Sequence, residues 1–293
     1  MPVRPVAGVF FLGSTILDHP VARLSACPEP LLHQRIQQPS SWSGATLHLG
    51  RNHGMTSTPT IRELPLFPLP DVVLFPQEVL PLHIFEPRYR MLLSTVMAED
   101  RRFGVVRWDP QEQRMASVGC CAEILHCQTQ PDDRSNIVTM GQQRFRVLEI
   151  VREAPFRVGL VSWIEDEVSS SHDDLQTLTA AVTQALQDVV ELTGKLVGKP
   201  AHLPNDLPDL PRELSFWIGS HLGGPVADEQ QALLELTDTG DRLRQEYELL
   251  DQTRRQLAAR TVLMDTFRDL GDSEPDADSD GDPAGDSEPG GQG

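Results

Sequence analysis

The stretch Leu64–Arg90, LPLFPLPDVVLFPQEVLPLHIFEPRYR, decides how this chain folds. It is rich in apolar residues, yet prolines interrupt it at positions 65, 68, 70, 76, 81 and 87. Proline lacks a backbone N–H and fixes φ, so the stretch predicts neither a helix nor a central strand. We therefore expect short extended pieces joined by rigid corners, near 62–66, 72–75 and 79–85. Such a segment is typical of the opening of a small β-domain.

The residues that follow alternate between one helix and several strands. The sequence PRYRMLLSTVMAED (87–100) has helical period, and Pro87 suits a first helical position because its missing N–H would have no partner there. Turn residues, among them the lone Gly141, separate the strands that we expect after it. These strands lie near 103–108, 118–127, 135–140, 143–151 and 156–164.

From Ser171 onward the pattern is helical. Ser171 is a suitable N-cap, and the first helix is expected to end at Gly194 and Gly198. Pro211 opens a second helix, and two more are expected over about 227–236 and 239–268.

The chain therefore divides into four parts and belongs to the α+β class. We expect an extension over 1–60, either disordered or due to a start at Met1 where Met55 is the true one. A β-domain with one helix over 61–168 and a helical bundle over 169–270 follow. The acidic residues 271–293 predict a disordered tail.

Charge disfavours nucleic acid as a partner. Residues 1–54 contribute +2 and residues 271–293 contribute −8, so the body between them carries −12 of the net charge of −18. A phosphate-backbone binder needs clustered Lys and Arg. The longest apolar runs are too short for a transmembrane helix, so we expect no membrane partner. We expect a cytoplasmic protein, with organelle targeting by residues 1–54 as the alternative.

The usual signatures of catalysis and metal binding are absent from the sequence. No phosphate loop, GxGxxG, GxSxG or HExxH motif occurs, and the four cysteines form no CxxC pair. We expect neither metal nor cofactor. Cys120 and Cys121 lie side by side on an expected strand, which points them to opposite faces and favours buried structural thiols. His83 stands beside Glu86, where an acid/base pair is conceivable.

Several stretches resemble the N-terminal substrate-binding domain of the Lon proteases. ELPLFPLPDVVLFPQEVLPLHIFEPRYRML (63–92) resembles the opening of that domain, and GQQRFRVLEI (141–150) resembles its G-x-x-R-F-x-V strand. ELSFWIGSHLGGPVADEQQALLELTDTGDRLRQEYELLDQ (213–252) resembles its helical half. The resemblance covers about 62–267 and implies a PUA-like β pseudo-barrel followed by a helical bundle.

The same resemblance implies a function without catalysis. The Lon ATPase and Ser/Lys protease motifs are missing from the sequence, so we expect a stand-alone recognition domain. Its partners would be unfolded or tagged polypeptides, or a protease or chaperone. Phe75, Phe103 and Trp108 are the first candidates for exposed binding residues, with core packing as the alternative. Two other functions stay open: redox or hydrolytic chemistry at Cys120, Cys121 or His83, and RNA binding by a PUA-like module.

Overall fold

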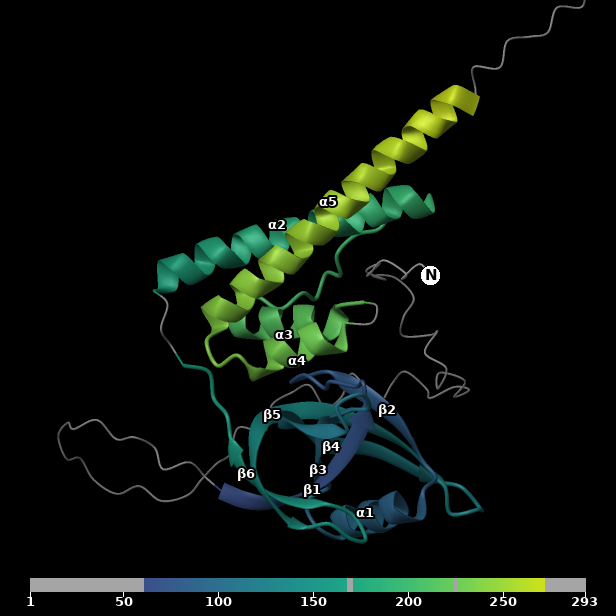
Figure 1. Ribbon diagram of the computed structural model, residues 1–293, viewed down its shortest axis with the longest axis vertical. Coiled ribbons are helices and arrows are strands. Elements are labelled where there is room, and N and C mark those ends of the chain that lie inside the picture. The colour runs from purple at the N-terminus through teal and green to yellow at the C-terminus, as the bar shows by residue number, and fades with distance from the viewer. Residues whose placement is uncertain (1–60, 168–170, 224–225, 272–293) are drawn as a thin grey trace, which may run out of the picture.

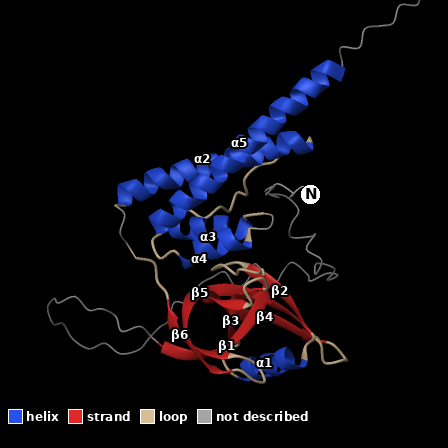
Figure 2. Cartoon of the chain, viewed as in Figure 1, coloured by secondary structure: helices blue, strands red, loops and turns tan. Residues whose placement is uncertain are grey.

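The computed structural model describes residues 61–167, 171–223 and 226–271, so the predictions for 1–60 and 272–293 lie outside the described residues. Six strands form a ring, and the four helices α2–α5 gather beyond one side of it (Figures 1 and 2). The strands are β1 Ile61–Pro70, β2 Val79–Ile84, β3 Arg102–Asp109, β4 Arg114–Thr129, β5 Ser135–Arg152 and β6 Val158–Trp163. The helices are α1 Pro87–Ala98, α2 His172–Val197, α3 Pro211–His221, α4 Ala227–Glu235 and α5 Thr239–Gly271.

The sheet closes on itself because one long strand has two sets of neighbours. The strand order is β2-β5-β4-β3-β1-β6, and β5 also pairs with β6. All pairings are antiparallel except that of β1 with β3. This closed mixed sheet followed by helices confirms the predicted α+β class and its order of β pseudo-barrel and helical part.

Strand β1 lies between two neighbours in the ring, although its prolines predicted no central strand. Its first half, 61–65, pairs with β6, and its second half, 66–70, pairs with β3. Each half therefore has a partner on one side, which is the situation of an edge strand, where proline is tolerated. The extended piece expected near 62–66 was too short, because the expectation did not allow one strand to change partners midway.

Gly141 lies inside β5 and does not end a strand, so the predicted break there was also wrong. A Cβ atom at residue 141 would lie 1.9 Å from the carbonyl oxygen of Phe75. Two backbone hydrogen bonds accompany this approach: Gln77 N–H donates to the Gly141 carbonyl at 2.7 Å, and Gly141 N–H donates to the Glu78 carbonyl at 2.8 Å. Glycine is required here because a side chain would prevent the two backbone segments from approaching each other so closely.

Alternation along the strands supplies two separate clusters of apolar side chains. Phe67, Val105 and Cys120 join the cluster that α1 covers. Their neighbours Leu66, Val106 and Cys121 join a second cluster with Phe145. Neighbouring side chains on a strand point to opposite faces, so the ring is packed on both. Cys120 and Cys121 lie on opposite faces, as the sequence predicted.

The helices α2 and α3 begin where local chemistry predicts, and α2 ends at one of the two glycines expected to end it. Ser171 Oγ accepts a hydrogen bond from Asp174 N at 3.2 Å, Gly198 ends α2 with φ of 72°, and Pro211 is the first residue of α3. Gly194 lies within α2 and does not end it. A third apolar cluster joins these helices to Val73, Phe75, Val118 and Ile164 of the β part. The helical part and the ring therefore share one continuous core.

Candidate functional site

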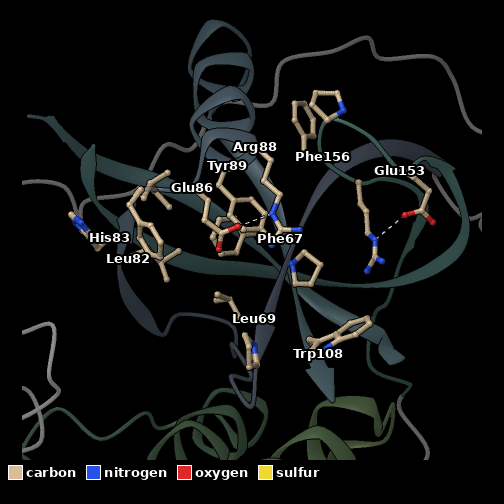
Figure 3. Close-up of a pocket in the computed structure, with 16 residues that line it drawn as sticks. Phe67, Leu69, Leu82, His83, Glu86, Arg88, Tyr89, Trp108, Glu153 and Phe156 are labelled. Carbon is tan, nitrogen blue, oxygen red and sulfur yellow. Dashed lines mark hydrogen bonds and ion pairs between the residues drawn. The ribbon is translucent and has the colours of Figure 1, made fainter. Parts of the chain in front are cut away.

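A cleft of about 510 Å³ opens on the β-ring between strands that come from distant parts of the sequence. Its walls are β1 residues 67–70, the end of β2 at 82–84, the start of α1, Trp108 at the end of β3, and the β5–β6 hairpin at 153–157 (Figure 3). The proline-broken opening stretch, Leu64–Arg90, thus supplies three of the walls.

Aromatic rings form much of the cleft surface. Phe67 and Tyr89 pack with ring centroids 4.1 Å apart, and both are largely buried. Phe85 is 58% exposed and Trp108 is half-buried, so these two rings are open to a ligand. Burial raises the pKa of Tyr89, which keeps its phenol neutral. Such rings offer large apolar contact area with few rotatable bonds.

The charges at the rim of the cleft are paired with one another. Arg88 Nε donates to Glu86 Oε2 at 2.8 Å, and Arg157 Nε donates to Glu153 Oε2 at 3.0 Å. The guanidinium carbons lie over aromatic rings, Arg88 4.5 Å from the Tyr89 centroid and Arg157 5.4 Å from that of Trp108. Two cations and two anions leave the rim neutral, which favours an uncharged ligand over an acidic or basic one.

Of the three residues expected as exposed candidates, one lines the cleft. Trp108 does so, and its role in binding stays a proposal. The expectation of exposed rings at Phe75 and Phe103 is wrong, because their exposed fractions are 0% and 1%. The ring centroids of Phe103 and Phe67 lie 5.8 Å apart, and Phe75 lies in the core shared with the helices. Their alternative role, core packing, is the one that the structure gives them.

The structure separates the two members of the conceivable acid/base pair. His83 Nδ1 lies 2.6 Å from Asn136 Oδ1 on the neighbouring strand, and its ring stacks on Phe85. The carboxylate of Glu86 is engaged by Arg88. A general base needs a partner within hydrogen-bond reach, and here each group already has a different one. His83 therefore acts as a wall of the cleft.

The vicinal cysteines are enclosed in the two strand clusters. Burial raises the pKa of Cys121 to about 12 and that of Cys120 well above its usual value. Both groups stay protonated near neutral pH, and a thiol is a much poorer nucleophile and metal ligand than a thiolate. Cys127 packs against the same cluster as Cys120 and not with Cys121, because a register shift lies between Ile124 and His126.

A second cleft, of about 660 Å³, lies between the ring and the helices beside a buried charge cluster. Asp166 is 7% exposed and pairs with two fully buried arginines, Arg144 of β5 and Arg242 of α5. The Arg144 guanidinium also donates to the carbonyls of Leu234 and Leu236 at 2.6 and 2.5 Å. These contacts hold the ring against the helices, so the buried charges of the cluster have a structural role.

Sequence reasoning missed Phe67, Phe85 and Tyr89 as cleft residues. One signal was available for Phe85, which is the last residue of an expected extended piece and stands two residues before Pro87, the expected start of a helix. A large apolar residue at such a corner has few neighbours of its own chain to cover it. Phe67 carried no such signal, since strand alternation does not say which face borders a cleft.

Two classes of site are absent from the part of the chain that the structure describes. No group of three or more His, Cys, Asp or Glu residues within it is placed to hold a metal ion. Within the same residues, no helix combines the length and the apolar character that crossing a membrane requires.

Comparison with known proteins gives matches over most of the described chain. Residues 63–252 match the family profile described as the ATP-dependent protease La (LON) substrate-binding domain. Lon protease 2 of Myxococcus xanthus is 30% identical over 197 residues, which are 65% of this chain and 24% of that protein. Lon protease of Xanthomonas oryzae is 29% identical over 195 residues, 64% of this chain and 22% of that protein.

Solved structures of the same kind also match. A crystal structure of a Lon N-terminal domain protein from Xanthomonas campestris is 25% identical, covers 63% of this chain and 96% of its own, and has a TM-score of 0.47. The N-terminal domain of a Mycobacterium avium complex Lon protease is 20% identical, covers 66% and 98%, and has a TM-score of 0.45.

The matched region is a different share of this chain and of its relatives. The chain spans about a quarter of the length of the curated relatives that it matches. The family profile, in contrast, covers more than half of the chain and includes both the β-ring and the helices α2–α4 with the first part of α5. This chain belongs to the family of the substrate-binding domain of ATP-dependent protease La (Lon).

Proposed function

We propose that this chain is a protein-recognition module that binds unfolded or tagged polypeptides in the cleft of the β-ring, with no catalysis of its own. The observation that carries the proposal is the cleft itself, with its exposed Phe85 and half-buried Trp108 above a floor of packed rings. Unfolded chains expose the apolar side chains that such a surface can cover. Membership of a substrate-binding family supports the same reading.

A protease or chaperone is the other partner class that the module would serve. A domain that holds a polypeptide without cutting it needs a second protein to act on what it holds. The free thiols of Cys120, Cys121 and Cys127 suit a reducing compartment such as the cytoplasm as the place of this work.

The two other functions considered from the sequence lack a supporting observation. Redox or hydrolytic chemistry would need an accessible thiolate or a base, but Cys120 and Cys121 are buried and His83 is engaged by Asn136. RNA binding would need unpaired cations, but the cleft arginines pair with Glu86 and Glu153. Polypeptide binding is the function that the cleft chemistry favours.

A direct binding experiment tests the proposal. Fluorescein-labelled β-casein, a chain without a stable fold, would be titrated with the protein and followed by fluorescence anisotropy. We expect saturable binding that Phe85→Ala weakens by about fivefold or more, because truncating an aromatic anchor at the centre of an interface costs about 1–2 kcal/mol. Phe85 is exposed, so its truncation leaves the fold intact.

Val197→Ala provides the matched control. Val197 is 61% exposed at the end of α2, away from the cleft residues, and its truncation removes apolar surface elsewhere. The affinity of this variant should equal that of the parent protein. Equal losses in the two variants, or no saturable binding at all, would refute the cleft as the polypeptide site.

A further inference from the structure

The edge of β1 that borders the cleft lacks backbone donors. Leu66 N–H donates to the Arg157 carbonyl at 2.8 Å, so residue 66 points toward the β5–β6 hairpin. Asp71 N–H, five residues on, donates to the Trp108 carbonyl of β3 at 3.3 Å. Backbone groups of successive strand residues alternate in direction, so Pro68 and Pro70 point to the same side as Leu66. On that side each proline offers a carbonyl and no N–H.

The edge of β2 has the same property at its centre. β2 pairs with β5 alone, so its other edge is without a strand partner among the described residues. Thr139 Oγ1 of β5 donates to the Leu80 carbonyl at 2.9 Å, which shows that Leu80 points toward β5. The next residue, Pro81, therefore points to the free edge and again offers only a carbonyl. Within the cleft, the outward N–H that this edge of β2 still offers is that of His83.

A polypeptide that joins a sheet as an extra strand needs alternating donors and acceptors along the edge that it joins. Pro68 and Pro70 leave the β1 edge without donors in the cleft, and Pro81 removes the middle donor of the β2 edge. Such prolines are one way in which proteins prevent strand addition. We propose that the cleft takes a polypeptide through its bulky apolar side chains and does not add it as a strand of the sheet. This inference rests on the proposed function and specifies the ligand.

The chemistry of the walls defines the ligand segment more closely. Phe85 and Trp108 offer apolar area, so the segment carries aromatic or branched aliphatic side chains. The paired rim charges leave no net charge to attract a charged segment. Since backbone hydrogen bonds contribute little, residues without an N–H, such as proline, are tolerated within the segment. The recognised class is an uncharged segment with bulky apolar side chains, whatever strand-forming capacity it has.

N-methylated peptides separate the two binding modes. The probe is a fluorescein-labelled nine-residue peptide of Phe, Leu and Ser, with two further versions N-methylated at the odd or at the even positions. Methylation removes alternate N–H donors and blocks strand pairing along one edge of the peptide, while it keeps every side chain. We expect all three dissociation constants to agree within about threefold, and Phe85→Ala to weaken all three by about fivefold or more relative to Val197→Ala.

The outcomes distinguish this inference from the function on which it rests. A loss of about tenfold or more with either methylated peptide, while the parent peptide binds, would overturn side-chain recognition and leave polypeptide binding in place. Failure of all three peptides to bind would overturn both. Equal binding of the three, weakened in common by Phe85→Ala, supports the inference.

Discussion

The ring of Phe75 lies against the backbone of Gly219, so that a loop of the β part packs directly against helix α3. A Cβ atom at residue 219 would lie 2.6 Å from Cε1 of Phe75, and neither residue has room to move, because both are buried. The contact joins the residues just after β1 to the helical part, and it predicts which substitutions separate the two.

Gly219→Ala should destabilise the protein although alanine is the better helix former. Overpacking of a core costs about 1–3 kcal/mol, and the gain in helix propensity returns about 1 kcal/mol. We expect a net loss of up to about 2 kcal/mol in the free energy of unfolding, measured by urea denaturation. Because Phe75→Leu makes room for the methyl group, the double variant should lose less than the sum of the single losses. Additive losses would show that the two residues do not meet.

Asp166→Asn should have a larger effect, because Asp166 is the carboxylate shared by two buried arginines. Removing its charge leaves Arg144 and Arg242 buried without compensation, which costs about 3–5 kcal/mol. The control is Asp132→Asn, which breaks an ion pair with Arg134 in which both side chains are about half exposed. Exposed pairs contribute about 0–1 kcal/mol, so the control should lie near the parent in urea denaturation. Similar losses in both variants would contradict the structural role of the buried cluster.

Glu246 should make the protein less stable as the pH rises. Its side chain is fully buried, its carboxyl oxygens have no hydrogen-bond partner among the described residues, and burial raises its pKa well above 4.5 against the opposing effect of Arg242. The folded state therefore keeps a proton that the unfolded chain releases above about pH 4.5. Stability conferred by that proton is present at lower pH and is lost as the pH rises toward the folded-state pKa.

Glu246→Gln tests this dependence because glutamine keeps the shape and stays neutral. The free energy of unfolding, measured between pH 5 and 9, should fall less steeply with pH in this variant than in the parent. Some slope should remain, since burial also raises the pKa of Glu78 to about 8. Glu248→Gln, at an exposed position of the same helix, should leave the slope unchanged. If the parent and Glu246→Gln gave parallel curves, the buried carboxyl would not titrate as inferred.

Local chemistry predicted much of this fold, and its failures have a common physical cause. Pro87, Ser171 and Pro211 mark helix starts through their own backbone and side-chain properties, and the structure has helices beginning there. Gly141 was misread because its role depends on the Phe75 carbonyl, which only the folded chain brings near. The proline-rich β1 was misread because its change of partners, after Pro65, depends on where β6 begins.

The candidate site shows the same limit. Trp108 was named from the sequence and lines the cleft, but Phe103, on the same strand, is covered by the packing of α1 and its neighbours. Strand alternation separates the two faces without saying which of them another element covers. Phe85 and Tyr89 came together with Trp108 only when β2, α1 and β3 met in space. An aromatic residue therefore becomes a binding candidate through its neighbours and not through its type.

Pro81→Val should make the protein associate with itself through the free edge of β2. The substitution restores an N–H between Val79 and His83, so three successive outward positions would offer both donor and acceptor. We expect larger species whose fraction grows with protein concentration in sedimentation velocity. Pro204→Val, at an exposed loop position outside the sheet, should sediment as the parent does. If Pro81→Val also matched the parent at every concentration, the proline would not be what keeps this edge from pairing.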